Sequence, residues 1–214
     1  MPTDADIGNM ALSRLGTRAT IASLTENSAE ARALNTWYAT IRDDLLRAAD
    51  WNFNRVYLDL AESGTPPVRW YYSYAYPSDA LKIWGFDFGL PSYMQTIPPL
   101  YEVASDGTNR LIYTNMSPAT AVYCQRVTDP NRMDSTFVTA FAVALAAAVA
   151  MPITQKVEVS ARLTAQAKEL FETAVAQSAN EQMTAERFRE AETLNVRGTQ
   201  TDALFIDGAL VRPF

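Results

Sequence analysis

The residues that could carry chemistry in this chain are carboxylates. Asp43 and Asp44 are adjacent, and a second acidic group runs from Glu186 to Glu192. Glycoside hydrolysis needs only two carboxylates, so a polysaccharide hydrolase is one candidate function. Acidic pairs on helices are usually solvated, however, and no spacing here distinguishes an acid from a base. The carboxylates therefore do not by themselves predict an enzyme.

Aromatic side chains could assist such chemistry by stacking against sugars. Trp51 and Trp70 have the right chemical type. Each stands at the start of a segment that we expect to be extended, and tryptophans in such positions usually belong to a core. We therefore predict a packing role for both.

Several other kinds of site are excluded by composition. None of the 214 residues is histidine, so Ser-His-Asp sites, Cys-His sites and histidine-based metal sites cannot form within one chain. Cys124 is the single cysteine, which rules out an intrachain disulfide and is consistent with a reducing cytoplasm. We expect it to be an inert, packed thiol. The glycines match no phosphate-binding loop and the aspartates no calcium loop, so we expect no cofactor and no metal.

The composition is that of a globular, acidic protein. Hydrophobic residues make up 48% and charged residues 20%, while the formal net charge is −6. A conventional DNA-binding protein needs a basic face to neutralise phosphates, and this chain lacks the required excess. An acidic protein can still surround DNA that must slide past it, because like charges repel.

Two segments bear on targeting and membranes. The acidic start of the chain, Met1 to Asp6, lacks the pattern of a signal peptide. Residues 135–155 contain no charge and approach membrane-spanning length. They are mostly alanine and are interrupted by Pro152, so we predict a buried bundle helix and no membrane anchor; a membrane-associated protein is the alternative.

The first fifty residues predict two amphipathic helices. The first spans about residues 3–15, with Thr3 or Asp4 as its cap and Gly16 at its end. The second begins after Asn27 or Ser28 and continues to about residue 49. Its expected buried face consists of Ala31, Leu34, Tyr38, Ile41, Leu45 and Ala48 or Ala49.

Residues 51–129 predict a small antiparallel β-sandwich or barrel-like domain of five or six strands. Its first strand is expected from Trp51 to Ala61. A turn at Asp106-Gly107 predicts a hairpin.

Helices return after the β region. One is predicted at about 134–150, with Pro152 barring simple continuation, and the last at about 156–182. The predicted fold is therefore α+β. A bundle of about four helices is formed by residues 1–50 and 130–183, the β domain of 51–129 is inserted into it, and 184–214 form an extended C-terminal arm.

The order of residues in the first half of the chain is distinctive. It comprises Asn9-Met10-Ala11-Leu12, Leu15-Gly16, Ile21, Leu24, Ala31, Asn35, Tyr38, Arg42-Asp43, Leu45-Leu46, Trp51-Asn52-Phe53 and Leu60-Ala61, followed by the aromatic run from Trp70 to Pro77-Ser78-Asp79. This order resembles the tail tubular protein A family, the ring-forming head-to-tail adaptors of short-tailed bacteriophages. The resemblance covers roughly residues 1–85 and, more loosely, 130–182.

The resemblance implies a structural virion protein without enzymatic activity. It would form a ring of about twelve subunits between the portal protein above and the tail nozzle protein below. Double-stranded DNA would pass through the ring during genome ejection without specific binding. The protein would be located at the head–tail interface of the virion after assembly in the host cytoplasm.

Two sets of residues are candidates for the contacts of such a ring. Small residues in the uncharged helix would allow close helix approach, although they could equally pack within one subunit; they are Ala140, Ala142, Ala144, Ala146, Ala147 and Ala148. Apolar residues of the arm lack an obvious partner and are candidates for portal contact, unless the arm folds back on its own subunit. They are Leu204, Phe205, Ile206, Leu210, Val211 and Phe214.

Two alternative functions remain open. One is the connector or head-completion protein of a long-tailed phage, which usually lacks so large an inserted β region. The other is the tail-associated polysaccharide hydrolase with paired carboxylates introduced above.

Overall fold

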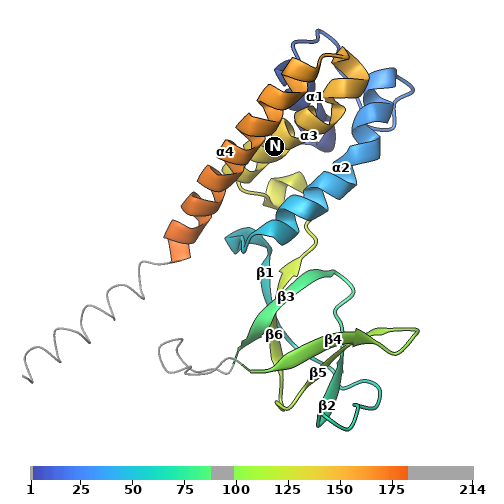
Figure 1. The fold of residues 1–214 in the computed structure, drawn as a ribbon, viewed down its shortest axis with the longest axis vertical. Coiled ribbons are helices and arrows are strands. Elements are labelled where there is room, and N and C mark those ends of the chain that lie inside the picture. Colours follow the sequence, from blue (N-terminus) through green and yellow to red (C-terminus); the bar gives the residue numbers. More distant parts are fainter. Residues whose placement is uncertain (1, 88–98, 183–214) are drawn as a thin grey trace, which may run out of the picture. The chain divides into compact units, whose positions relative to one another are not determined.

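The structure is a computed structural model that describes residues 2–87 and 99–182 (Figure 1). These residues form four α-helices and two small antiparallel sheets, which confirms the predicted mixed α+β class. The chain divides into two compact units, Met1–Val175 and Ala176–Phe214. The described part of the second unit is the end of α4, and the predicted arm, 184–214, lies outside the described residues.

The first two helices begin where their capping residues predict. α1 spans Asp4–Arg14, and Thr3 forms a capping box with Asp6. α2 spans Ala29–Ala48, and the Ser28 hydroxyl accepts a hydrogen bond from the Ala31 amide at 3.2 Å. Four of the predicted buried positions of α2 differ in depth: Ala31, Leu34 and Tyr38 are buried, whereas Ile41 is only partly buried.

The third helix, α3, continues through a proline. It spans Ser135–Thr154, so the prediction that Pro152 prevents continuation was wrong. Pro152 lies in the last turn, where little helix remains to be disrupted. The Gln155 amide still bonds the Met151 carbonyl at 3.1 Å, and Gln155 then ends the helix in the left-handed conformation.

The position of α3 bears on the question of a membrane. By length and composition α3 could cross one, but more than half of its most apolar segment is buried inside the structure. The central helix of a soluble bundle satisfies the same criterion. The burial agrees with the predicted bundle helix.

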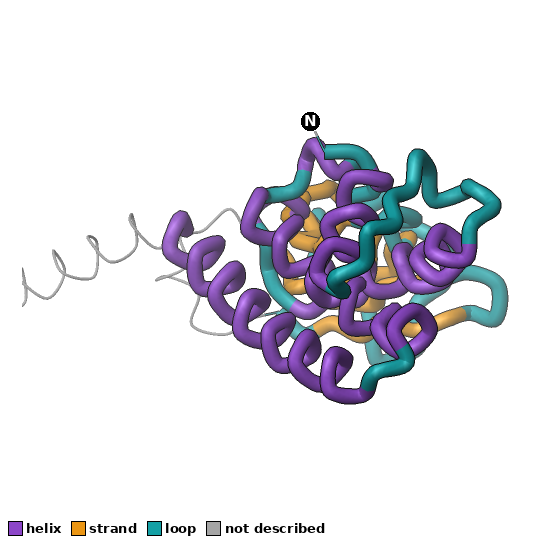
Figure 2. Tube along the Cα trace, turned by 90° about the horizontal axis from the view of Figure 1, so that it is seen from above, coloured by secondary structure: helices purple, strands orange, loops and turns teal. Residues whose placement is uncertain are grey.

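A single core joins the helices from both sides of the β region. α1, α2 and α3 meet the first part of α4, which spans Val157–Gln182; Figure 2 looks onto these helices, with the strands behind them. The largest fully buried side chains of this core are Trp51, Phe137, Phe141, Ile7, Leu12, Leu34, Leu46, Leu145 and Leu163. Burial of this apolar surface is the main stabilising contribution to the bundle.

Trp51 belongs to that helical core rather than to a strand. It is 1% exposed, and its ring lies 5.0 Å from Phe137 and 5.8 Å from Phe171, both nearly edge-on. A short 3₁₀ turn, Asn52–Asn54, follows it. The predicted strand therefore begins only at Arg55, because Trp51 is held in the bundle.

Six strands form the inserted region. The first sheet has the order β1-β6-β3, with β1 at Arg55–Asp59, β6 at Thr120–Gln125 and β3 at Ala80–Asp87. The second has the order β2-β5-β4, with β2 at Tyr72–Ala75, β5 at Arg110–Thr114 and β4 at Tyr101–Ser105. All pairs are antiparallel, and β4 and β5 form the predicted hairpin.

The two sheets share an apolar core, as in a small sandwich. Tyr74 and Ile112 from the second sheet pack with Ile83, Phe86 and Tyr123 from the first. The opposite face of the second sheet is covered by the loop before β2. In that loop Gly64 has a positive φ of 73°, and Trp70 packs on Leu111 and Tyr113.

Candidate functional site

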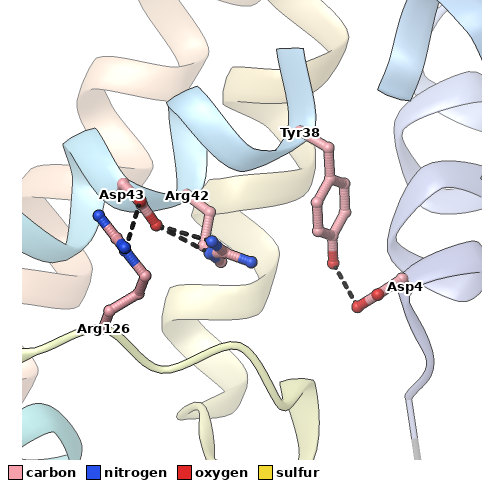
Figure 3. A network of polar contacts seen from close by, with 5 residues as sticks. All are labelled: Asp4, Tyr38, Arg42, Asp43 and Arg126. Carbon is pink, nitrogen blue, oxygen red and sulfur yellow. Dashed lines mark hydrogen bonds and ion pairs between the residues drawn. The ribbon is translucent and has the colours of Figure 1, made fainter. Parts of the chain in front are cut away.

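The adjacent carboxylates proposed from the sequence have different environments. Asp43 accepts two hydrogen bonds from Arg42, at 2.8 and 3.0 Å (Figure 3). It also forms an ion pair with Arg126, whose Nε lies 2.9 Å from Asp43 Oδ2. Asp44 is exposed. Both oxygens of the Asp43 carboxylate are therefore bound by arginines of the same chain. Asp43 thus belongs to a structural ion-pair network, and Asp44 does not share it.

A second polar contact joins α1 to α2. The Tyr38 hydroxyl donates to the Asp4 carboxylate at 2.9 Å, and the ring of Tyr38 packs edge-on against Phe141 at 5.0 Å (Figure 3). Burial and the neighbouring Asp4 carboxylate both raise the pKa of the Tyr38 phenol. The phenol therefore stays protonated and acts as a donor that fixes the two helices.

The bundle and the β region are also joined by a buried contact around Cys124. Asn54 Nδ2 lies 3.2 Å from Cys124 Sγ and 3.4 Å from the Leu46 carbonyl, and Cys124 Sγ donates to the same carbonyl at 3.2 Å. Asn54 and Cys124 are both fully buried. Burial raises the pKa of the Cys124 thiol to about 11, although the Asn54 hydrogen bond opposes this. Such a thiol is protonated and unreactive, as predicted.

The described ranges, 2–87 and 99–182, contain no group of three or more acidic or cysteine side chains that could hold a metal ion. The Glu186–Glu192 carboxylates lie outside them. The polar contacts described above join helices to one another and the bundle to the β region.

The candidate subunit-packing alanines of α3 differ in accessibility. Ala140 is 1% exposed and packs inside the subunit. Ala144, Ala147 and Ala148 are partly exposed. The candidate portal-contact residues, Leu204 to Phe214, lie outside the described residues.

One exposed apolar region was not predicted from the sequence. The most exposed large hydrophobic side chains of the described residues are Val68, Tyr71 and Leu100, at 108%, 78% and 71%. Tyr72, Thr114 and Tyr101 are in register across the second sheet, so Tyr71 and Leu100 flank Asn115 at the end of that sheet. We call Val68, Tyr71 and Leu100 the apolar sheet end.

The apolar sheet end is held by well-defined contacts. The Trp70 amide bonds the Pro67 carbonyl at 2.8 Å, which closes a turn around Val68. The Trp70 indole donates to Glu102 at 3.0 Å, and the Tyr71 amide donates to Asn115 at 3.0 Å. Large contiguous apolar patches are typical of interaction surfaces, whereas single exposed apolar side chains are common on soluble proteins. A sequence signal existed in Pro66-Pro67-Val68, a rigid turn with an apolar tip, but it identifies no partner.

Comparisons with known proteins assign no family. No protein-family model matches the sequence, and no curated protein matches it significantly. The function is therefore argued from the residues and the fold.

Proposed function

We propose that this chain is a structural virion protein, a head-to-tail adaptor that forms a ring between the portal and the tail nozzle of a short-tailed bacteriophage. The observation that carries the proposal is the architecture: helices from both ends of the described chain share one core, and a β-sandwich is inserted between them. Connectors of long-tailed phages usually lack so large an inserted β region, so this architecture favours the adaptor of a short-tailed phage.

The residues that carry the resemblance have structural contacts. The Asn9 amide donates to the Ile21 carbonyl at 2.9 Å and accepts from the Ile21 amide at 2.8 Å, which fixes the loop after α1. Trp51 lies in the helical core. The described contacts of these residues are thus packing and loop contacts, which a scaffolding subunit needs.

The charge supports the same proposal. Each subunit carries a formal charge of −6, and a closed ring multiplies it around the channel. Repulsion between the ring and the DNA phosphates would reduce adhesion during ejection.

The proposal is tested by co-expression with the portal protein of the same virus. The full chain is compared with a chain truncated after Met183, and with Phe205→Asp and its matched control Thr201→Asp. We expect rings stacked coaxially on the portal for the full chain and for Thr201→Asp. We expect loss of portal binding on truncation and weaker binding for Phe205→Asp.

The other outcomes discriminate among functions. A ring that survives truncation keeps the adaptor role and assigns the portal contact to residues before 184. No association with the portal contradicts the adaptor role. Release of sugar from a host polysaccharide, lost in Glu186→Gln or Glu190→Gln, would instead support the hydrolase.

A further inference from the structure

We propose that Asp106-Gly107, at the tip of the β4–β5 hairpin, is a latent site of isoaspartate formation. The closed turn protects the Asp106 carboxylate, and opening of the turn allows this side chain to react with the backbone. The inference rests on the geometry of the hairpin and does not depend on the adaptor role.

The reaction needs only water and groups that the chain itself supplies. The Gly107 nitrogen attacks Asp106 Cγ, and the amide hydrogen and the carboxyl hydroxyl leave as water, so that a cyclic imide forms. Water then opens the ring at one of its two carbonyl carbons. Cleavage between the nitrogen and Cγ restores aspartate, whereas cleavage between the nitrogen and the α-carbonyl carbon leaves a main chain that runs through Cβ and Cγ.

The residue that follows Asp106 favours this attack. Glycine has no side chain to shield its amide nitrogen, and Gly107 adopts a positive φ of 95°, which other residues rarely adopt. A Cβ added there would meet nothing within 4 Å, and residues 105–110 are all exposed. Solvent water and room for rearrangement are therefore present at the tip.

The closed turn opposes the attack because it binds the carboxylate. Asp106 Oδ1 accepts hydrogen bonds from the Thr108 amide at 2.8 Å and from the Asn109 amide at 2.6 Å. The Asp106 amide bonds the Asn109 carbonyl at 3.1 Å, which closes the turn. Imide formation converts the charged carboxylate into a neutral group, and neutral oxygens are weaker acceptors. The two bonds therefore stabilise the aspartate relative to the imide.

Protonation and the orientation of the nucleophile act in the same direction. The hydrogen bonds from the Asn109 and Thr108 amides hold the pKa of the Asp106 carboxyl below its usual range. Near neutral pH the closed turn therefore contains less of the neutral carboxyl, the form that loses water readily. The Gly107 amide donates to Ser105 Oγ at 3.2 Å and is thus engaged with another group.

Isoaspartate at this position would alter the hairpin. The main chain between Ser105 and Arg110, the last pair of the β4–β5 ladder, would gain one extra backbone atom. That lengthening would weaken the pairing of β4, which carries Glu102, the acceptor of the Trp70 indole. The modification would therefore affect the second sheet beyond the turn itself.

The test compares the folded chain with the chain unfolded in guanidinium chloride. Both are incubated at the same pH and temperature and digested, and isoaspartate at Asp106 is measured by isoaspartyl methyltransferase labelling and mass spectrometry. We expect formation in the folded chain to be at least about tenfold slower, since one hydrogen bond to a charged group is worth at least that factor. Asp207-Gly208, which lies outside the described residues, is the reference in guanidinium chloride, where both sites should react at similar rates.

Matched variants separate the carboxylate hydrogen bonds from the general rigidity of the fold. Thr108→Pro removes one of the two amide donors to Asp106, whereas Thr108→Ala keeps it. We expect severalfold faster formation in folded Thr108→Pro and an unchanged rate in folded Thr108→Ala. Gly107→Ala should reduce the signal at Asp106 in both states, because a side chain then shields the nitrogen.

Each outcome supports or overturns the proposal. Slow formation in the folded chain, accelerated by Thr108→Pro and unchanged in Thr108→Ala, supports it. Equal rates at Asp106 in the folded and unfolded chain, equal rates in the two folded Thr108 variants, or no isoaspartate at Asp106 where Asp207 reacts would overturn it. If Thr108→Pro does not fold, the comparison of the folded and unfolded unmodified chain still decides.

Discussion

Arg126, immediately after β6, donates its Nε to the Asp43 carboxylate of α2 at 2.9 Å. These residues are 83 positions apart by number, yet they join the inserted β region to the bundle (Figure 3). Beside them, Leu46, Asn54 and Cys124 form a buried contact between the same two regions. These contacts join the β region to α2 of the bundle.

The ion-pair network predicts unequal effects for two neighbouring carboxylates. Asp43→Asn should lower the free energy of unfolding by about 1–3 kcal/mol, because it leaves Arg42, whose side chain is 11% exposed, without its carboxylate. Asp44→Asn is the control and should change it by less than about 0.5 kcal/mol. Urea unfolding followed by circular dichroism measures both. Equal effects would contradict the account of Asp43.

Trp51 is expected to be the most sensitive tryptophan. Trp51→Ala should lower the free energy of unfolding by about 3–5 kcal/mol. The substitution opens a cavity in the helical core and removes a 3.0 Å hydrogen bond to the Leu45 carbonyl. The control is Trp37, a tryptophan of α2 whose side chain is 43% exposed. Its replacement by alanine should cost no more than about 1 kcal/mol by the same unfolding measurement. A smaller effect at Trp51 than at Trp37 would refute its assignment to the core.

Alanine substitutions at two glycines with positive φ distinguish the effect of backbone strain on stability from the effect of packing. A side chain at Gly107, where φ is 95°, would meet nothing within 4 Å, so Gly107→Ala should cost about 1 kcal/mol through strain alone. At Gly64, where φ is 73°, an added Cβ would lie 3.2 Å from Leu111 Cδ1. Gly64→Ala should therefore cost about 2 kcal/mol or more. Thermal unfolding of the two variants should rank them in that order, and the reverse order would argue against the loop covering the second sheet.

The Cys124 thiol predicts a loss of stability at alkaline pH. Burial raises the pKa of Cys124 from 9.0 to about 11, so the folded state holds this proton more tightly than the unfolded state. The resulting stabilisation is complete below pH 9 and is lost as pH rises through about 11. The free energy of unfolding should thus fall between pH 9 and pH 11 more steeply for the unmodified chain than for Cys124→Ala. Parallel pH profiles would contradict the buried, protonated thiol.

Local signals predicted the helices well. Thr3 and Ser28 cap their helices as predicted, and Gly107 turns the β4–β5 hairpin. These features depend on residues within a few positions of one another. Pro152 was misread because the burial of α3 outweighs the loss of one hydrogen bond near its end.

Features that depend on distant contacts could not be predicted. The pairing of β1 with β6 joins Arg55 to Cys124, and the sequence contains no signal for that register. The start of β1 was misplaced because Trp51 packs against Phe137, whose position only the tertiary structure reveals. The apolar sheet end was missed for a similar reason, since Tyr71 and Leu100 become neighbours only through β5.

The central claim, that this chain is a ring-forming adaptor, is tested most directly by cryo-electron microscopy of the full chain co-expressed with the portal of its virus. The account predicts a closed ring with cyclic symmetry, about twelve copies, coaxial with the portal and traversed by an open channel. In that map the arm beyond Met183 would contact the portal. A portal that carries no density for this chain would contradict the adaptor function.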